Sequence, residues 1–141
     1  MKLQIVLDTN VLISALRSDE GASFKLFSLL GDSRFDINIS VPLVLEYEEI
    51  AQRQAEELGL TTQDIDDALD YICTVARQRL IFFLWRPYLK DAEDDHILEL
   101  AFEAGCDYIV TYNLRDFSGV ERLGIQVVTP VQFLQRIGEL P

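Results

Sequence analysis

The chain of 141 residues is poor in the side chains that bind soft metals, with one histidine and two cysteines. Cys73 and Cys106 stand far apart and no CxxC pair is present, so a zinc site is not expected. Isolated cysteines of this kind are usually buried thiols. We interpret the lone His96 as a surface or packing residue.

Positive charge is also scarce, because 12 Lys and Arg residues face 24 Asp and Glu residues and the net charge is −12. Broad, unassisted binding to nucleic acid requires surface Lys and Arg, so this class of protein is disfavoured. The net charge does not exclude a small acidic pocket that contacts phosphate through bound cations. It also does not exclude binding to a basic protein partner.

The sequence has no apolar run of the length that crosses a membrane, and no small-residue cleavage site follows its N-terminus. We therefore expect a cytoplasmic protein that does not enter a membrane. The length suits one domain over residues 1–141, which is enough to bury a sizeable core.

Short apolar runs alternate with helical patterns along the chain, which predicts an α/β fold. We expect a three-layer α/β/α sandwich around a mostly parallel sheet of four to five strands. The predicted strands are residues 3–7, 37–40, 80–85, 108–111 and 126–129. The predicted helices are residues 11–17, 22–30, 42–58, 91–103 and 131–137, with one more after a capping box at Thr61 and Asp64. The aromatic stretch 81–85 could belong to the core or to an interface.

Oxygen-bearing side chains follow several of these strands. Ligands of open α/β sheets bind outside the carboxyl ends of the strands, so these residues are the candidate site. They come from four separate segments: Asp8 and Asn10; Glu46; Asp91, Glu93, Asp94 and Asp95; and Thr111, Asn113 and Asp116.

Clustered carboxylates repel one another, and a hard divalent cation removes that repulsion. Mg²⁺ and Mn²⁺ prefer oxygen ligands, and such ions activate water for phosphodiester cleavage. The scarcity of histidine and reactive cysteine is no obstacle to this chemistry.

Each acid also has a plain structural interpretation. Asp8 could cap the first helix, and Asp94 or Asp95 could complement a helix dipole, a role we assign to Asp95. Glu46 could lie on a solvated helix face, and Asp116 could be a turn residue. Their joint arrival at one edge of the sheet favours a functional site.

Four segments of the chain resemble the motifs of the PIN-domain family, in the family's order and over nearly the whole length. The first and fourth motifs are the more specific ones. The segments are residues 5–12 (IVLDTNVL), 41–47 (VPLVLEY), 94–101 (DDHILELA) and 107–117 (DYIVTYNLRDF).

The resemblance implies a Mg²⁺- or Mn²⁺-dependent ribonuclease, and in small chains the toxin of a toxin–antitoxin pair that a small antitoxin inhibits. A homodimer is also implied. By the same resemblance Asp8, Glu46, Asp94 and Asp116 are the catalytic, metal-holding acids. Asn113 stands where many such toxins have Asp, so the fourth acid is assigned to Asp116, with Asn113 as an auxiliary ligand.

The expected substrate contacts lie around these acids: Thr9, Asn10, Thr111, Asn113 and Arg115, with Lys90 flanking the site. Two other functions stay open. A haloacid-dehalogenase-type phosphatase would use Asp8 as nucleophile, although it needs a second Asp where this chain has Asn10. A non-enzymatic interaction domain of the same fold would not bind metal.

Overall fold

The sheet of this protein is parallel throughout in the part of the chain that the computed structural model describes, residues 2–80, 89 and 94–141. Five strands lie in the order β3-β2-β1-β4-β5, and each neighbouring pair is parallel. The predicted α/β fold is therefore confirmed. The strands are β1 (Leu3–Leu7), β2 (Phe35–Ile39), β3 (Arg77–Gln78), β4 (Tyr108–Val110) and β5 (Gln126–Val128).

Helices connect these strands, and their bounds follow the predicted pattern closely. The helices are α1 (Thr9–Arg17), α2 (Ala22–Ser28), α3 (Val41–Arg53), α4 (Ala55–Leu58), α5 (Thr62–Val75), α6 (Asp95–Glu103) and α7 (Pro130–Arg136). Two short 3₁₀ helices, η2 (Leu114–Phe117) and η3 (Val120–Leu123), lie between β4 and β5. None of the helices in these described residues is long and apolar enough to span a bilayer.

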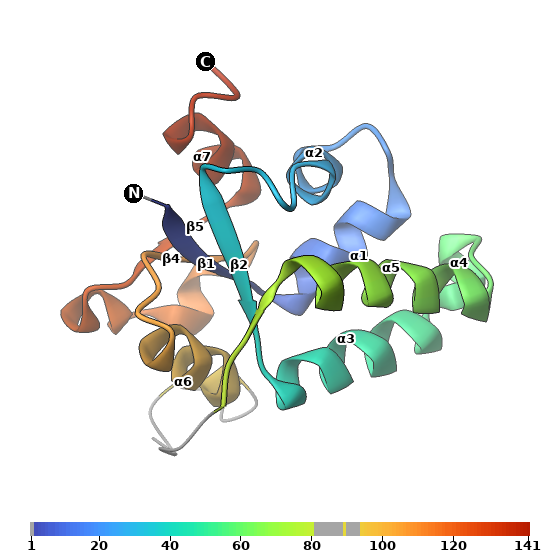
Figure 1. The fold of residues 1–141 in the computed structure, drawn as a ribbon, viewed down its shortest axis with the longest axis horizontal. Coiled ribbons are helices and arrows are strands. Elements are labelled where there is room, and N and C mark those ends of the chain that lie inside the picture. The colour runs from blue at the N-terminus through green and yellow to red at the C-terminus, as the bar shows by residue number, and fades with distance from the viewer. Residues whose placement is uncertain (1, 81–88, 90–93) are drawn as a thin grey trace.

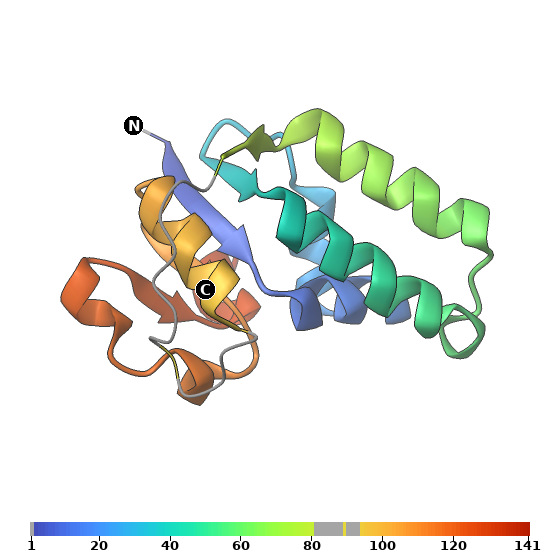
Figure 2. The ribbon, with the colours of Figure 1, turned by 90° about the horizontal axis from the view of Figure 1, so that it is seen from below.

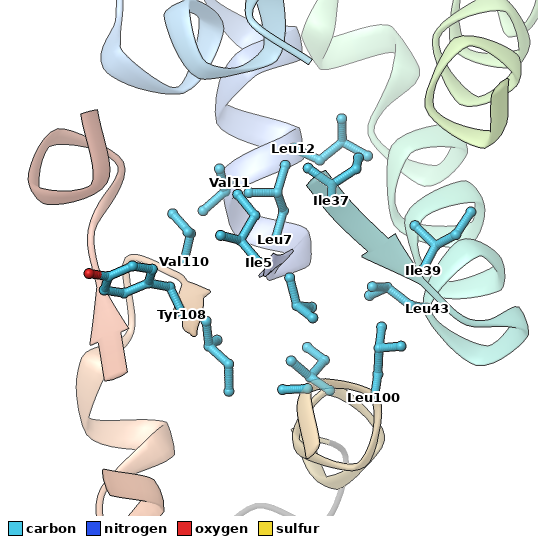
Figure 3. Close-up of a cluster of buried hydrophobic side chains, with 14 of the residues drawn as sticks. Ile5, Leu7, Val11, Leu12, Ile37, Ile39, Leu43, Leu100, Tyr108 and Val110 are labelled. Atoms are coloured by element: carbon cyan, nitrogen blue, oxygen red, sulfur yellow. The ribbon is translucent and has the colours of Figure 1, made fainter. Parts of the chain in front are cut away.

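The sheet lies between two layers of helices (Figure 1). Helix α6 packs on β1 and β2, while α2 and α7 contact each other on the opposite side. Strand β1 is central, and its Ile5 and Val6 are fully buried, as a strand covered on both faces requires. In Figure 3, Leu12 of α1 and Leu100 of α6 lie on opposite sides of β1.

Helices α1 and α3 begin where β1 and β2 end and continue away from the sheet (Figure 2). Helix α5 returns beside α3, and α1 also contacts α3. The first turns of α1 and α3 therefore meet at the carboxyl edge of the sheet. This is the edge at which the sequence predicts the site.

Two predicted elements differ from the structure. The helix expected over residues 42–58 is two helices, α3 and α4, which meet at Gln54, and Gly59 ends α4 with a φ of 70°. The strand expected over residues 80–85 falls mainly outside the described residues, and Leu80 is not in a strand. Instead, the edge strand β3 is formed by the exposed Arg77 and Gln78, whose polar sequence carries no strand signal.

Candidate active site

Asp8 and Thr111 are adjacent because β1 and β4 pair in parallel register. Leu7 is paired with Val110, so the next residue of each strand leaves the sheet at the same place. The backbone N–H of Asp8 donates to the carbonyl of Val110 at 2.9 Å, which extends the ladder by one step. The Thr111 hydroxyl then donates to Asp8 Oδ2 at 2.8 Å. The pairing of these two site residues thus follows from strand register.

Asp8 is both the cap of α1 and a member of the site. Its Oδ1 accepts the backbone N–H of Thr9 at 2.8 Å, which satisfies one free donor of the helix N-terminus. Its Oδ2 accepts from Thr111 and, at 3.3 Å, from Asn10 Nδ2. The two interpretations of Asp8 are therefore compatible, since each oxygen serves one of them.

The pKa of Asp8 is raised above its ordinary value of 3.8. Burial is the largest cause, and the negative charges of Glu46 and Asp116 add to it. The hydrogen bonds from Thr111 and Thr9 act in the opposite direction and do not fully offset burial. Asp8 is thus a carboxylate whose charge the described protein groups do not compensate.

Glu46 reaches the site from α3, which begins after the capping residue Ser40 and carries Pro42 in its first turn. The buried Tyr47 hydroxyl donates to the carbonyl of Leu7 and fixes this helix against the end of β1. Glu46 Oε2 accepts from the Thr9 hydroxyl, and Oε1 lies 3.1 Å from His96 Nε2. Burial alone would raise the pKa of Glu46, but the bonds from His96 and Thr9 lower it.

His96 is more than the surface or packing residue that we expected from sequence. It lies in the first turn of α6, and its Nε2 contacts a carboxylate from a helix 50 residues earlier. Its position two residues after Asp94 places it near the candidate site. The sequence does not indicate which acid it contacts.

Asp94 and Asp95 have separate surroundings although they are neighbours. Asp94 stands just before α6 and lines the cavity of the site. Asp95 is fully buried, and its Oδ1 accepts the backbone N–H of Leu89 at 2.8 Å. The division of roles made from sequence, with Asp95 in the first helical turn, agrees with these positions.

A cavity of about 390 Å³ lies at the carboxyl edge of the sheet. Asp8, Glu46 and Asp94 arrive there from three different segments, so the tertiary fold brings together three of the four predicted acids. The other lining residues are Thr9, Asn10, Ile13, Arg17, Ile50, Gln54 and Asn113. A second cavity of about 410 Å³, beside α3, α5 and β3, has no acidic residue among its described lining residues, and these lack the chemistry of this site.

The fourth segment contributes through Asn113 more directly than through Asp116. Asn113 lines the cavity, and its backbone N–H donates to Thr111 Oγ1 at 3.0 Å. Asp116, in η2, is close enough for its charge to raise the pKa of Asp8, but it is not among the lining residues. Arg115 is exposed and also outside that lining.

The backbone and amides around the cavity are held by further contacts. Asn10 Oδ1 accepts the N–H of Tyr112 at 3.2 Å, while its amide lies 3.3 Å from Thr111 Oγ1. Thr9, Asn10 and Thr111 therefore act first as supports for the acids. Lys90, Asp91 and Glu93, which the sequence also indicated, lie outside the described residues.

The donors of this cavity suit a hard divalent cation, because carboxylate, amide and hydroxyl oxygens are its preferred ligands. In the described residues, however, no three His, Cys, Asp or Glu side chains converge closely enough to form a ready metal cage. Glu46 is turned toward Thr9 and His96, and Asp8 toward Thr111. The donor types fit a cation, and the carboxylates would have to approach one another more closely to hold it.

Comparison with known proteins adds a family to this geometry. The family model described as PIN domain matches residues 4–115 of the 141. Among solved structures, the chain resembles one of VapBC2 from Rickettsia felis bound to a DNA fragment from its promoter. The TM-score is 0.61 at 14% identity, over 89% of this chain and 97% of that one. No curated protein matches the sequence.

Proposed function

The chain belongs to the PIN domain family, and from that premise we propose that it is a Mg²⁺- or Mn²⁺-dependent endoribonuclease. The observation that carries the proposal is the cavity at the carboxyl edge of the sheet. Asp8, Glu46 and Asp94 line it together although they are far apart in sequence. An acidic cavity in which no Lys or Arg of the described residues forms an ion pair with Asp8 is the arrangement that a cation-assisted phosphodiester hydrolase needs.

In this proposal Asp8, Glu46 and Asp94 would hold the principal metal, and Asp116 would complete the set directly or through water. When bound, the cation lowers the pKa of an attacking water and stabilises the leaving oxygen. Thr111 and the N–H of Thr9 hold the Asp8 carboxylate in a fixed orientation. His96 and the Thr9 hydroxyl do the same for Glu46.

Asn113 and Asn10 line this cavity, where their side chains would orient the RNA backbone. Arg115 is exposed nearby on η2 and would contact a more distant phosphate. Each of these contacts should contribute little to affinity, and the net charge of −12 opposes RNA binding.

We further propose that the chain is a toxin that a small antitoxin protein inhibits, and that it works as a homodimer in the cytoplasm. The support is family membership and the fold shared with a structure of VapBC2. The acidic character of the chain suits a partner with a basic segment, because opposite surface charges speed association.

The deciding experiment is cleavage of mixed RNA in Mn²⁺ by the wild-type chain and by Asp8→Asn. We expect the variant to lose at least about 10³-fold in rate, because it removes a charge on which the bound cation depends. Asp36→Asn is the matched control, since Asp36 lies on β2 with Lys2 and Arg77 as partners and should retain full activity. Full activity of a pure, folded Asp8→Asn protein would refute the assignment.

The alternative of a non-enzymatic domain makes a different prediction for the same proteins. Calorimetric titration with Mn²⁺ should show binding to the wild type and none to Asp8→Asn. Absence of Mn²⁺ binding to the wild type would favour the interaction domain. The phosphatase alternative loses its basis with the PIN family match, and it would require a phosphoaspartate that can be trapped at Asp8.

A further inference from the structure

Arg17 is the only Lys or Arg among the described residues that line the acidic cavity. It is the last residue of α1, and it shares a face of that helix with Asn10 and Ile13, which also line the cavity. Residues three, four and seven apart lie on one side of an α-helix, so this face of α1 is directed at the site.

The guanidinium of Arg17 has a neutral partner. Its Nη2 donates to Gln54 Oε1 at 3.2 Å, and no carboxylate in the described part of the chain lies within 4.0 Å of it. Arg34, Arg53 and Arg77 each contact an acid instead. Of the five N–H donors of a guanidinium, Arg17 thus uses one on the described residues.

Two structural explanations of Arg17 account for only part of this arrangement. A cation in the last turn complements the helix dipole, but that effect does not require a side chain at the cavity. Compensation of the acids also fails as an explanation. No carboxylate in the described part of the chain, those of Asp8 and Glu46 included, forms an ion pair with the guanidinium of Arg17.

We propose that Arg17 forms a phosphate subsite of this cavity and binds a backbone phosphate of single-stranded RNA beside the scissile linkage. The inference rests on the proposed ribonuclease function. A guanidinium binds phosphate through two parallel N–H···O bonds, and such charge-assisted bonds are among the strong ones. In a chain of net charge −12, a guanidinium that lines the acidic cavity and has no carboxylate partner among the described residues should have a large effect on where RNA binds.

The test is the salt dependence with which the full chain binds a fluorescent single-stranded oligoribonucleotide in EDTA. Each phosphate contact in single-stranded RNA contributes about 0.7 to the slope of log K against log salt. Arg17→Gln should bind the oligoribonucleotide about tenfold more weakly at low salt. It should also reduce the magnitude of the salt slope by about 0.7. Arg53→Gln is the control, because it removes an equal charge from an exposed arginine that is paired with Glu49.

A second pair of variants leaves Arg17 in place and changes its partner. Gln54→Glu puts a carboxylate against the guanidinium, so it should weaken RNA binding and lower the slope as Arg17→Gln does. Gln54→Ala removes the partner and should bind at least as well as the wild type. Gln135→Glu, on α7 and in contact with the Pro141 carbonyl, controls for the added negative charge.

Cleavage in Mn²⁺ gives an independent readout, since loss of a binding contact should raise KM for RNA and leave kcat nearly unchanged. If the wild type cleaves and Arg17→Gln keeps the wild-type affinity and slope, the subsite is refuted while the ribonuclease function stands. If Arg17→Gln instead weakens only the binding of an acidic peptide, the arginine serves a protein partner and the inference is overturned. A wild type that neither cleaves nor binds RNA refutes both proposals.

Discussion

The two ends of the parallel sheet treat their carboxylates differently. At the end where the strands begin, Asp36 contacts Lys2 and Arg77, and Arg34 joins Asp32 to Glu139. At the end where the strands finish, Asp8 and Glu46 contact two hydroxyls, one side-chain amide, a backbone N–H and one histidine.

The pKa values set Asp8 apart from the other acids at both ends, because the pKa of Glu46 is lowered by the bonds from His96 and Thr9. Arg34 holds the pKa of Asp32 at about 2, and hydrogen bonds from Gln4, Lys2 and Arg77 overcome burial to lower that of Asp36. The pKa of Asp8 is raised instead, chiefly by burial. The first set of acids stabilises the fold in its charged form, whereas charged Asp8 destabilises the fold. We infer that the role of Asp8 is to bind a cation. Substitutions at each end of the sheet can test this comparison.

The largest change in thermal stability should come from a cation bound at the carboxyl edge of the sheet. At a Mn²⁺ concentration of about 100 times Kd, binding stabilises the native state by about 2.7 kcal/mol, or roughly 5–10 °C in Tm. Scanning calorimetry of the wild type with and without Mn²⁺ measures this shift. Asp36→Asn should show the same shift and Asp8→Asn almost none. An equal shift in Asp8→Asn would place the bound ion elsewhere.

Without metal, Asp8→Asn should raise Tm by a few degrees at pH 7, because asparagine still caps α1 and carries no buried charge. The folded pKa of Asp8 exceeds its ordinary value of 3.8, so ionisation destabilises the folded state above the folded pKa. Below pH 3.8 Asp8 is protonated in both states, and the difference between variant and wild type should vanish. Thermal melts from pH 3 to pH 7 would show this dependence. A lower Tm at pH 7 would contradict it.

The smallest change in thermal stability should come from a substitution at the end of the sheet where the strands begin. Arg34→Gln should lower Tm by about 1–2 °C, since ion pairs that are only partly buried are screened by water and salt. The pKa of Asp32 is lowered to about 2, so its stabilising contribution is present above pH 3.8 and lost as the pH falls toward 2. Melts at several pH values should show the two proteins converging in acid. RNA cleavage should be unaffected, and a large loss of activity would contradict the separation of the two ends.

Much of the fold is readable from local sequence. The Thr61–Asp64 capping box, the buried strands and Gly59 at the end of α4 all lie where the sequence predicts them. The break between α3 and α4 could not be predicted, because Gln54 and the residues after it are ordinary helix formers. Strand β3 was missed because a two-residue, exposed edge strand has no apolar period.

The candidate site divides in the same way. The sequence by itself determined that Asp8 ends a buried strand and caps a helix, because both follow from residues within one turn of it. It also determined the PIN motifs, whose order along the chain needs no coordinates. It did not determine that His96 meets Glu46, that Asn113 lines the cavity and Asp116 does not, or that Arg17 lies across from Gln54. Only the tertiary structure decided these contacts, because each joins segments whose separation in space depends on how whole helices pack against the sheet.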